Sequence, residues 1–334
     1  MTTPITIGTL TVEPGTSARG VIPTGVDLAG QTDGIPIIVY HAYEPGPILW
    51  LNGATHGDEP EGAFSIFRTL AQLDPAEMRG TVVGVPAMNV PAFQAGERGN
   101  PLDTFSYDMN RLYPGRADGY PTERIAHAHW SAMKDQCDLQ VAIHSGGTHS
   151  YLAHMIFAAD NPQSLESAAA MGPQWDLVFK RGVGGNNPAS KVAELGKAGI
   201  TVELGGNCRT LTRDFHVVAN DLADSYLNLM RHYEMIEGDA QYATKWRMGH
   251  QQALLAPASG MWVGNPDLEF ERVMPEGTLL GEVYNLYGDV TAIVQAPCDG
   301  VVFGLRSRPA VLEGEWCCFY GIIDEERDDL LNTP

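Results

Sequence analysis

Basic residues are scarce in this chain of 334 residues, which contains 21 Lys and Arg against 41 Asp and Glu and carries a net charge of −20. A nucleic-acid backbone requires many Lys and Arg contacts to its phosphates, and anionic membrane surfaces attract the same side chains. The acidic balance therefore argues against nucleic acid and membrane as partners. It favours a protein that acts on small molecules, since a local Arg cluster can still reverse the field inside a pocket.

Cysteines and long apolar runs are also few. The five cysteines show neither a CxxC nor a Cys–His zinc-ribbon spacing, which predicts reduced, buried thiols rather than disulfides or a cysteine metal site. No apolar run approaches the roughly eighteen residues of a transmembrane helix. The N-terminus lacks the basic and apolar segments of a secretory signal. These absences predict a cytoplasmic location.

Apolar stretches of strand length alternate with helical stretches through the first two thirds of the chain. Three amphipathic stretches predict helices, one of them capped by Thr122, over 59–73, 122–134 and 214–236. Short and continuously apolar runs predict strands at 47–54, 81–89, 138–146, 155–160 and 200–206. This alternation is typical of an α/β domain whose sheet is covered on both faces.

Two flanking regions have a different texture. Residues 1–45 read as short strands separated by Gly and Pro. The texture changes again after Gly238, and residues 250–323 hold only short strand-like pieces between turns. We therefore expect an α/β domain of residues 1–245, with a mixed central sheet, helices on both faces and an N-terminal β segment at 1–45. A small barrel-like, all-β domain is expected over 246–334.

The segment HGDEPEG, residues 56–62, crowds a histidine and three acidic residues into the junction between a strand and a helix. Asp58 followed by Glu61, with a proline in the first turn, predicts a helix cap and its reciprocal partner. His56 and Glu59 are then left over. An imidazole and a carboxylate at this spacing form a zinc-ligand pair, but the pair is common by chance and needs a second histidine.

His144 is the candidate for that second histidine. It ends the buried-strand pattern DLQVAIHSGG, and ligands of open α/β sheets bind beyond the carboxyl ends of strands. His56 also follows a strand, so two imidazoles and Glu59 can make a His₂Glu zinc tripod with one open position. The alternative for His144 is a structural histidine whose hydrogen bonds are satisfied in the core.

Zinc-dependent hydrolysis also needs a carboxylate that moves a proton from water to the leaving group. Glu203 lies within the apolar run ITVELGG, where burial is costly without a function and raises the pKa toward that of a general base. The alternative is a carboxylate that faces outward from an edge strand. Asn110 and Arg111 offer a neutral donor and a planar fork for a substrate carboxylate, and Arg98 offers a cation for an oxyanion.

Together these segments resemble the succinylglutamate desuccinylase/aspartoacylase family, a branch of the zinc carboxypeptidase superfamily. The segments HGDEPEG, NVPAFQAGER, DMNRLYPG, IHSGG and VELGG occur in the family's order between residues 47 and 206. The C-terminal β region resembles the family's appended barrel, which is similar to biotinyl and lipoyl domains. Its hairpin YNLYGDV has no lysine at the tip, so a covalently attached carrier group is not expected.

The resemblance implies one zinc ion per subunit and a role for every candidate residue. The zinc ligands would be His56, Glu59 and His144. Arg98 would polarise the scissile carbonyl group, and Asn110 and Arg111 would bind the carboxylate of the substrate. Glu203 would act first as the general base and then as the general acid. A homo-oligomer, either a dimer or a tetramer, is expected from the size and the resemblance.

HGDEPEG, HSGG and VELGG are most similar to the branch of the family that contains N-acetyl-diaminobutyrate deacetylases. The expected activity is removal of a small acyl group from an N-acyl amino acid of that kind. Two departures bear on the substrate, because VELGG continues as NC and because His149 lies close to the predicted site. Two rival functions are a zinc carboxypeptidase of short peptides and a non-catalytic metal- or metabolite-binding protein.

Overall fold

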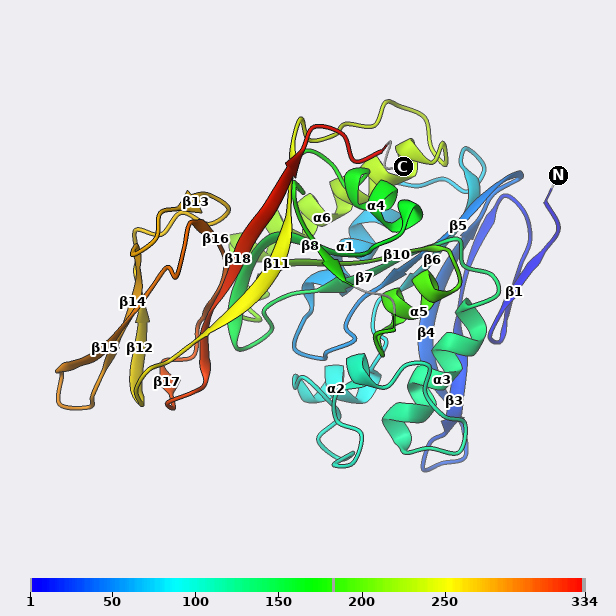
Figure 1. Ribbon diagram of the computed structural model, residues 1–334. Coiled ribbons are helices and arrows are strands. Elements are labelled where there is room, and N and C mark those ends of the chain that lie inside the picture. Colours follow the sequence, from blue (N-terminus) through cyan, green and yellow to red (C-terminus); the bar gives the residue numbers. More distant parts are fainter. Residues whose placement is uncertain (1, 182–183, 332–334) are drawn as a thin grey trace.

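The computed structural model describes residues 2–181 and 184–331, and most of its strands join one long mixed sheet (Figure 1). Taken from the C-terminal edge to the N-terminal edge, the twelve neighbouring strands are β13 (Val273–Met274), β16 (Gly300–Arg306), β18 (Trp316–Arg327), β11 (Trp246–Leu255), β9 (Leu177–Arg181), β8 (Ser150–Ala159), β10 (Ala198–Gly206), β7 (Leu139–His144), β5 (Glu44–Asn52), β6 (Arg79–Val85), β4 (Thr32–His41) and β3 (Thr16–Val26).

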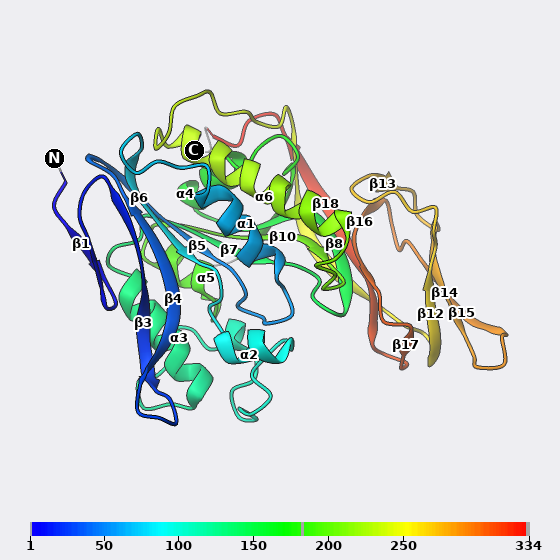
Figure 2. The ribbon, with the colours of Figure 1, turned by 180° about the vertical axis from the view of Figure 1, so that it is seen from behind.

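Two smaller sheets lie at opposite ends of the molecule, as Figures 1 and 2 show. One is a two-stranded sheet near the N-terminus, made of β1 (Ile5–Ile7) and β2 (Leu10–Val12). The other has four strands in the order β15 (Val290–Gln295), β14 (Leu279–Tyr284), β12 (Gly260–Gly264) and β17 (Ala310–Val311).

Helices cover the central strands on both faces (Figures 1 and 2). One face carries α1 (Glu61–Leu70), α4 (Pro162–Ala169) and α6 (Arg213–His232). The other carries α3 (Pro121–Met133) and α5 (Pro188–Glu194). Two short elements, α2 (Val90–Ala95) and the 3-10 helix η1 (Met109–Arg111), lie in the connection between β6 and α3.

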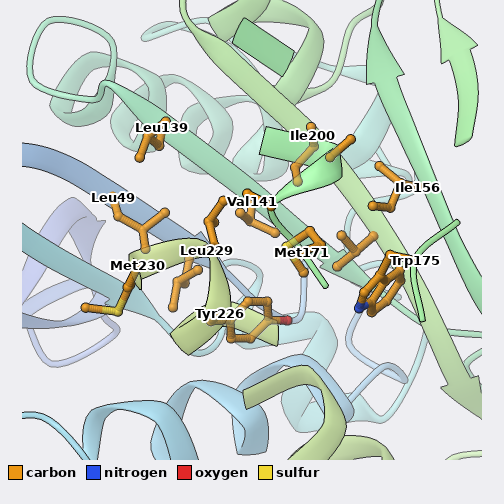
Figure 3. Close-up of a cluster of buried hydrophobic side chains, with 14 of the residues drawn as sticks. Leu49, Leu139, Val141, Ile156, Met171, Trp175, Ile200, Tyr226, Leu229 and Met230 are labelled. Atoms are coloured by element: carbon orange, nitrogen blue, oxygen red, sulfur yellow. The ribbon is translucent and has the colours of Figure 1, made fainter. Parts of the chain in front are cut away.

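The apolar run of β5 explains why helices cover both faces. Leu49, Trp50 and Leu51 are fully buried, and successive side chains of a strand point to opposite faces. Leu49 and Leu51 belong to the cluster under α1, α4 and α6, whereas Trp50 packs with the residues under α3. Figure 3 shows side chains of the first cluster, among them Tyr226 of α6. Burial of each such side chain stabilises the fold by about 1.5–3 kcal/mol.

The predicted fold class is confirmed: a mixed sheet carries helices on both faces and is followed by a β-rich C-terminal region. The predicted helices correspond to α1, α3 and α6. Helix α1 is shorter than predicted at both ends, α6 ends four residues earlier than predicted, and α3 is shifted by one residue. Thr122 as a helix cap was wrong, because Pro121 already occupies the first position of α3 and Tyr120 is its cap residue. Thr122 instead donates two hydrogen bonds of 2.8 Å to Asp103, from its backbone N and its Oγ1.

Five strands close into a ring that joins the C-terminal region to the central sheet. Strand β16 pairs with β18 on one side and with β8 on the other, and β9 and β11 complete the ring between them. Phe157, Phe179 and Phe303 pack together in a separate apolar cluster of these strands. The predicted domain boundary at residue 245 stays a prediction. Strand β11, which starts at Trp246, pairs with β9 from before this boundary and with β18 from after it.

A histidine clamped by two carboxylates also holds the C-terminal region against the helices. Nδ1 of His154 on β8 lies 2.7 Å from Oε1 of Glu271, and Nε2 lies 2.7 Å from Oδ2 of Asp221 on α6. Burial opposes the imidazolium, but the hydrogen bonds to Asp221 and Glu271 outweigh it and raise the pKa of His154 to about 9. The imidazole therefore links three segments that are distant in the sequence.

This clamp predicts that stability falls in mildly alkaline solution. The pKa of His154 rises from 6.5 to about 9 on folding, so its stabilisation is complete below about pH 6.5 and is lost as the pH approaches 9. The side chain is 17% exposed, and the shift corresponds to about 3 kcal/mol. Urea unfolding from pH 6 to 9 should show this loss in the wild type and not in His154→Gln. His250→Gln, at an exposed histidine paired with Asp324, is the control, and parallel profiles for wild type and His154→Gln would contradict the role.

The remaining predictions about cysteines and membranes have simple outcomes. All five cysteines are among the described residues and are free, as predicted, and three of them are buried. In the described part of the chain, no helix combines the length and the apolar character that a membrane crossing requires.

Candidate metal centre and pocket

The candidate site lies where parallel strands end. Strands β6, β5, β7 and β10 run parallel, so their carboxyl ends meet at one edge of the sheet. His56 and Glu59 follow β5, and His144 is the last residue of β7. Gly57 allows the backbone of this loop to lie close to α2, because a Cβ at this position would lie 2.0 Å from the backbone of Ala92.

Three predicted ligands converge in this space. Nδ1 of His56 lies 2.7 Å from Oε1 of Glu59, Nδ1 of His144 lies 2.8 Å from Oε2, and the two nitrogens lie 3.1 Å apart. All three side chains are buried, and their ligand atoms lie within 4.8 Å of one another. Two nitrogens bound at 2.0–2.1 Å to one tetrahedral zinc ion would lie about 3.3 Å apart. The spacing therefore fits a metal ion.

The second nitrogen of each imidazole also fits this interpretation. A metal-bound histidine usually donates its other N–H to a carboxylate or carbonyl group. Nε2 of His56 lies 3.1 Å from Oδ1 of Asp108, and Nε2 of His144 lies 3.4 Å from Nδ2 of Asn110. Oδ1 of Asn110 is buried and has no hydrogen-bond partner among the described residues. A 180° turn of this amide would make Oδ1 the acceptor for His144.

The charges of the three tripod side chains shift one another's pKa values. Burial opposes ionisation of Glu59, but His56 and His144 outweigh it and hold the pKa of this carboxyl well below its usual range. Burial lowers the pKa of His56, yet Glu59 and Asp108 raise it to about 9. A buried carboxylate that draws a proton onto a neighbouring imidazole is an environment that also favours a divalent cation.

Asp58 and Glu61 do not form the predicted capping box, and this prediction was wrong. Pro60 is the cap residue of α1, and no side chain caps this helix. Oδ2 of Asp58 accepts hydrogen bonds from the backbone N and Oγ1 of Thr148. Glu61 accepts from Ser145 Oγ at 2.7 Å and from the backbone N of Gly206 at 3.0 Å. Asp58 thus ties the segment before α1 to the loop between β7 and β8, and Glu61 ties the helix start to the ends of β7 and β10.

Glu203 stands beside the tripod. It lies on β10 and is paired in register with His144 of β7. Its side chain is only partly buried and lines the same pocket, so it does not face outward from an edge strand. Burial and the charge of Glu59 raise the pKa of Glu203 to about 8, although Arg181, His56 and Arg98 oppose the shift. A carboxylate with this pKa can accept and return a proton near neutral pH.

Arginines surround the pocket in a chain that has few cations. Nη2 of Arg98 lies 3.1 Å from Oδ2 of Asp108, and Nη1 lies 3.9 Å from Oε1 of Glu59. Arg111 is exposed at the end of η1, and its Nη1 donates to the carbonyl of Asn110. Arg181, at the end of β9, stacks its guanidinium 3.4 Å from the ring centre of Phe157. Its guanidinium makes no hydrogen bond or ion pair with the described residues, although the carbonyl oxygen of Arg181 accepts a hydrogen bond from the backbone N of Asp160.

All seven predicted site residues line one pocket of about 420 Å³. His149 lines it as well, with Nδ1 3.7 Å from Oδ2 of Asp58. The sequence reasoning missed Asp108, which contacts His56 and Arg98, and Arg181, which lines the pocket. Asp108 directly precedes the predicted Asn–Arg pair and could have been suspected there. For Arg181, the sequence carries no comparable signal, because nothing near it predicts a pocket.

Comparison with known proteins identifies the family. Residues 45–230 match the model of the succinylglutamate desuccinylase/aspartoacylase catalytic domain. The chain therefore belongs to this family, as its motifs predicted. It is 30% identical over 213 residues to the N-alpha-acetyl-L-2,4-diaminobutyric acid deacetylase of Halomonas elongata. That alignment covers 62% of this chain and 60% of the relative, so the chain spans about three fifths of its length.

Solved structures share the fold over nearly the whole chain. A succinylglutamate desuccinylase from Silicibacter sp. TM1040 superposes with a TM-score of 0.81 at 22% identity, covering 96% of this chain and 98% of the other. The product-bound ectoine utilization protein EutE (DoeB) from Ruegeria pomeroyi gives 0.80 at 24% identity, covering 96% and 100%. At these identities the likeness establishes the fold alone. The roles of the site residues, the location and the oligomeric state stay predictions.

Proposed function

We propose that this protein is a zinc-dependent amidohydrolase that removes a small acyl group from an N-acyl amino acid. The observation that carries the proposal is the buried convergence of His56, Glu59 and His144 beside Glu203 in one pocket. The deacetylase of Halomonas elongata supports an N-acetyl-diaminobutyrate-like substrate.

His56, Glu59 and His144 would hold the ion, with Asp108 orienting His56 through Nε2. A bound zinc ion would supply Lewis-acid polarisation of the amide carbonyl and would make water more acidic. Glu203 would accept a proton from the attacking water and then donate it to the departing amine nitrogen. Its pKa of about 8 supports both transfers near neutral pH.

The cations of the pocket would act on the substrate's oxygens. Arg98 lies beside Glu59 and would stabilise the oxyanion that develops on the scissile carbonyl. Arg111, with Asn110 beside it, would hold the carboxylate of the amino acid, because a guanidinium binds a carboxylate through two parallel N–H bonds. The hydrogen bond from His56 and the charge of Arg98 lower the pKa of Asp108, against the effect of burial. The ionised carboxylate of Asp108 would keep Arg98 in place.

A substrate panel with the zinc-loaded protein tests this proposal. N-acetyl-diaminobutyrate, N-acetylaspartate, N-succinylglutamate and N-acetyl-L-alanine should include at least one compound that is hydrolysed to a free amine and a carboxylate. Short peptides should be cleaved at least tenfold more slowly. Faster cleavage of dipeptides would favour a carboxypeptidase. Stoichiometric zinc without any hydrolysis would favour a non-catalytic binding protein.

A further inference from the structure

Glu61 is a buried carboxyl group that the proposed mechanism leaves without a role. It is the first residue of α1, two positions after Glu59, and its exposed fraction is only 2%. It is not among the residues that line the pocket, so it is not placed to touch a substrate there. Each of its oxygens accepts one hydrogen bond, Oε2 from Ser145 Oγ at 2.7 Å and Oε1 from the backbone N of Gly206 at 3.0 Å. A buried carboxyl group is costly without such partners, so this bridge is a specific feature of the fold.

The bond to Ser145 reaches the metal side of the pocket. Ser145 directly follows His144, and its backbone N donates a hydrogen bond of 3.3 Å to Oε2 of Glu59. The hydroxyl of Ser145 is thus held by one carboxyl group and its N–H by another. Outer partners of this kind orient the ligands of a metal site and tune its affinity. Glu61 therefore fixes the turn that follows His144 and, through Ser145, the carboxylate of Glu59.

The bond to Gly206 reaches the strand of the proposed base. Gly206 is the last residue of β10, three positions after Glu203. The pairing of β10 with β8 changes register between Glu203 and Gly205, and Gly205 and Gly206 have φ values of 85° and 136°. A Cβ at Gly205 would lie 3.3 Å from Cγ and Oε1 of Glu61. The two glycines therefore let the strand turn against the carboxyl group of Glu61 directly after Glu203.

We propose that Glu61 is a positioning residue that holds Glu203 at its working distance from the metal ligand His144. This inference rests on the proposed function, because the distance matters only if Glu203 moves protons beside a bound ion. The register of β7 and β10 pairs His144 with Glu203, and the bridge of Glu61 fixes the two chain segments just beyond that pair. A displacement of about 1 Å at a reacting group can lower a rate about 100-fold, so loss of the bridge should reach the chemistry.

The test compares Glu61→Ala with Glu61→Gln in the zinc-loaded protein, on the compound of the panel above that has the highest kcat/KM. Glu61→Ala should lower kcat by about 10- to 100-fold and leave KM within about twofold, because Glu61 does not line the pocket. Its zinc affinity, from competition with a chromophoric chelator, should fall about tenfold, as on loss of an outer partner. Glu61→Gln should keep both quantities within about threefold, since its amide can accept from Gly206 and donate to Ser145.

Two further variants locate the effect. Ser145→Ala removes only the bond on the β7 side, so zinc affinity should fall about as far as in Glu61→Ala, whereas kcat at saturating zinc should fall less. Asp138→Ala is the matched control, because Oδ2 of Asp138 accepts a hydrogen bond of 2.9 Å from the backbone N of Ile48. That bond also ties neighbouring strands through a carboxylate, but at the start of β7, away from His144. The control should keep wild-type kcat, KM and zinc affinity.

A wild-type kcat and zinc affinity in Glu61→Ala would overturn the inference, and so would losses in Glu61→Gln equal to those in Glu61→Ala. Equal losses in Asp138→Ala would overturn it as well, because any tie between strands would then have the same effect. If urea unfolding shows that Glu61→Ala does not fold, Ser145→Ala decides, and wild-type zinc affinity in that variant overturns the inference. If the wild type hydrolyses no panel compound, the proposed function fails, while the zinc affinities of the Glu61 variants still decide the inference.

Discussion

Replacing Glu203 with alanine is expected to lower kcat by about 10²- to 10⁴-fold, the usual contribution of a general acid–base group. Glu203 lines the pocket beside His144 and has a pKa of about 8, so it can take a proton from water and return it to the amine. Glu203 is not one of the three residues whose ligand atoms converge. Zinc content measured by mass spectrometry should therefore stay at one ion per chain while turnover collapses.

Two further variants make this prediction sharper. Glu203→Gln keeps the size of the side chain and its place on β10, so a loss equal to that of the alanine variant assigns the effect to proton transfer. Glu326→Ala removes an exposed carboxylate near the far end of β18 and should retain wild-type kcat. Near-normal turnover in both Glu203 variants would remove this residue from the mechanism.

Replacing His56 or His144 with alanine is expected to weaken zinc binding by more than about 100-fold and to abolish hydrolysis. Each replacement removes one of three ligands from a buried tripod. Asp108→Ala should have a smaller effect, a 10- to 100-fold loss of affinity, because Asp108 only orients His56 through Nε2. Competition with a chromophoric chelator measures all three affinities on one scale.

The order of these losses in zinc affinity distinguishes the metal ligands from other histidines. His250→Ala, at an exposed histidine on β11, should bind zinc as the wild type does. Chelation of the wild-type protein gives a second route to the metal-free state without altering a buried side chain, and added zinc should restore its activity. If the His56 variant binds zinc as tightly as the Asp108 variant, the tripod is not the metal site.

Much of the site could be predicted because the sequence around each residue shows where that residue lies relative to a strand. His56 follows one apolar run and His144 ends another, and parallel strands bring such ends to the same edge. Glu203 was predictable for the same reason, since a carboxylate inside an apolar strand demands a partner or a function. These residues lie far apart in the sequence, but the pattern of each strand is local.

The failures involve contacts that no local pattern encodes. Asp58 and Glu61 have the spacing of a capping box, yet their partners are Thr148 and Ser145, more than eighty residues away. A short-range rule cannot weigh a long-range hydrogen bond against a cap. The presence of Phe303 in the pocket has the same origin, because it depends on a pairing of β16 with β8 in which Gly304 lies opposite Leu152.

The most direct test of the whole account is an anomalous-scattering map, recorded at the zinc absorption edge, from crystals of the zinc-loaded protein. The account predicts one peak per chain, about 2.0–2.2 Å from Nδ1 of His56, Nδ1 of His144 and a carboxylate oxygen of Glu59. A zinc peak bound elsewhere, or an empty tripod in protein shown to contain zinc, would contradict it.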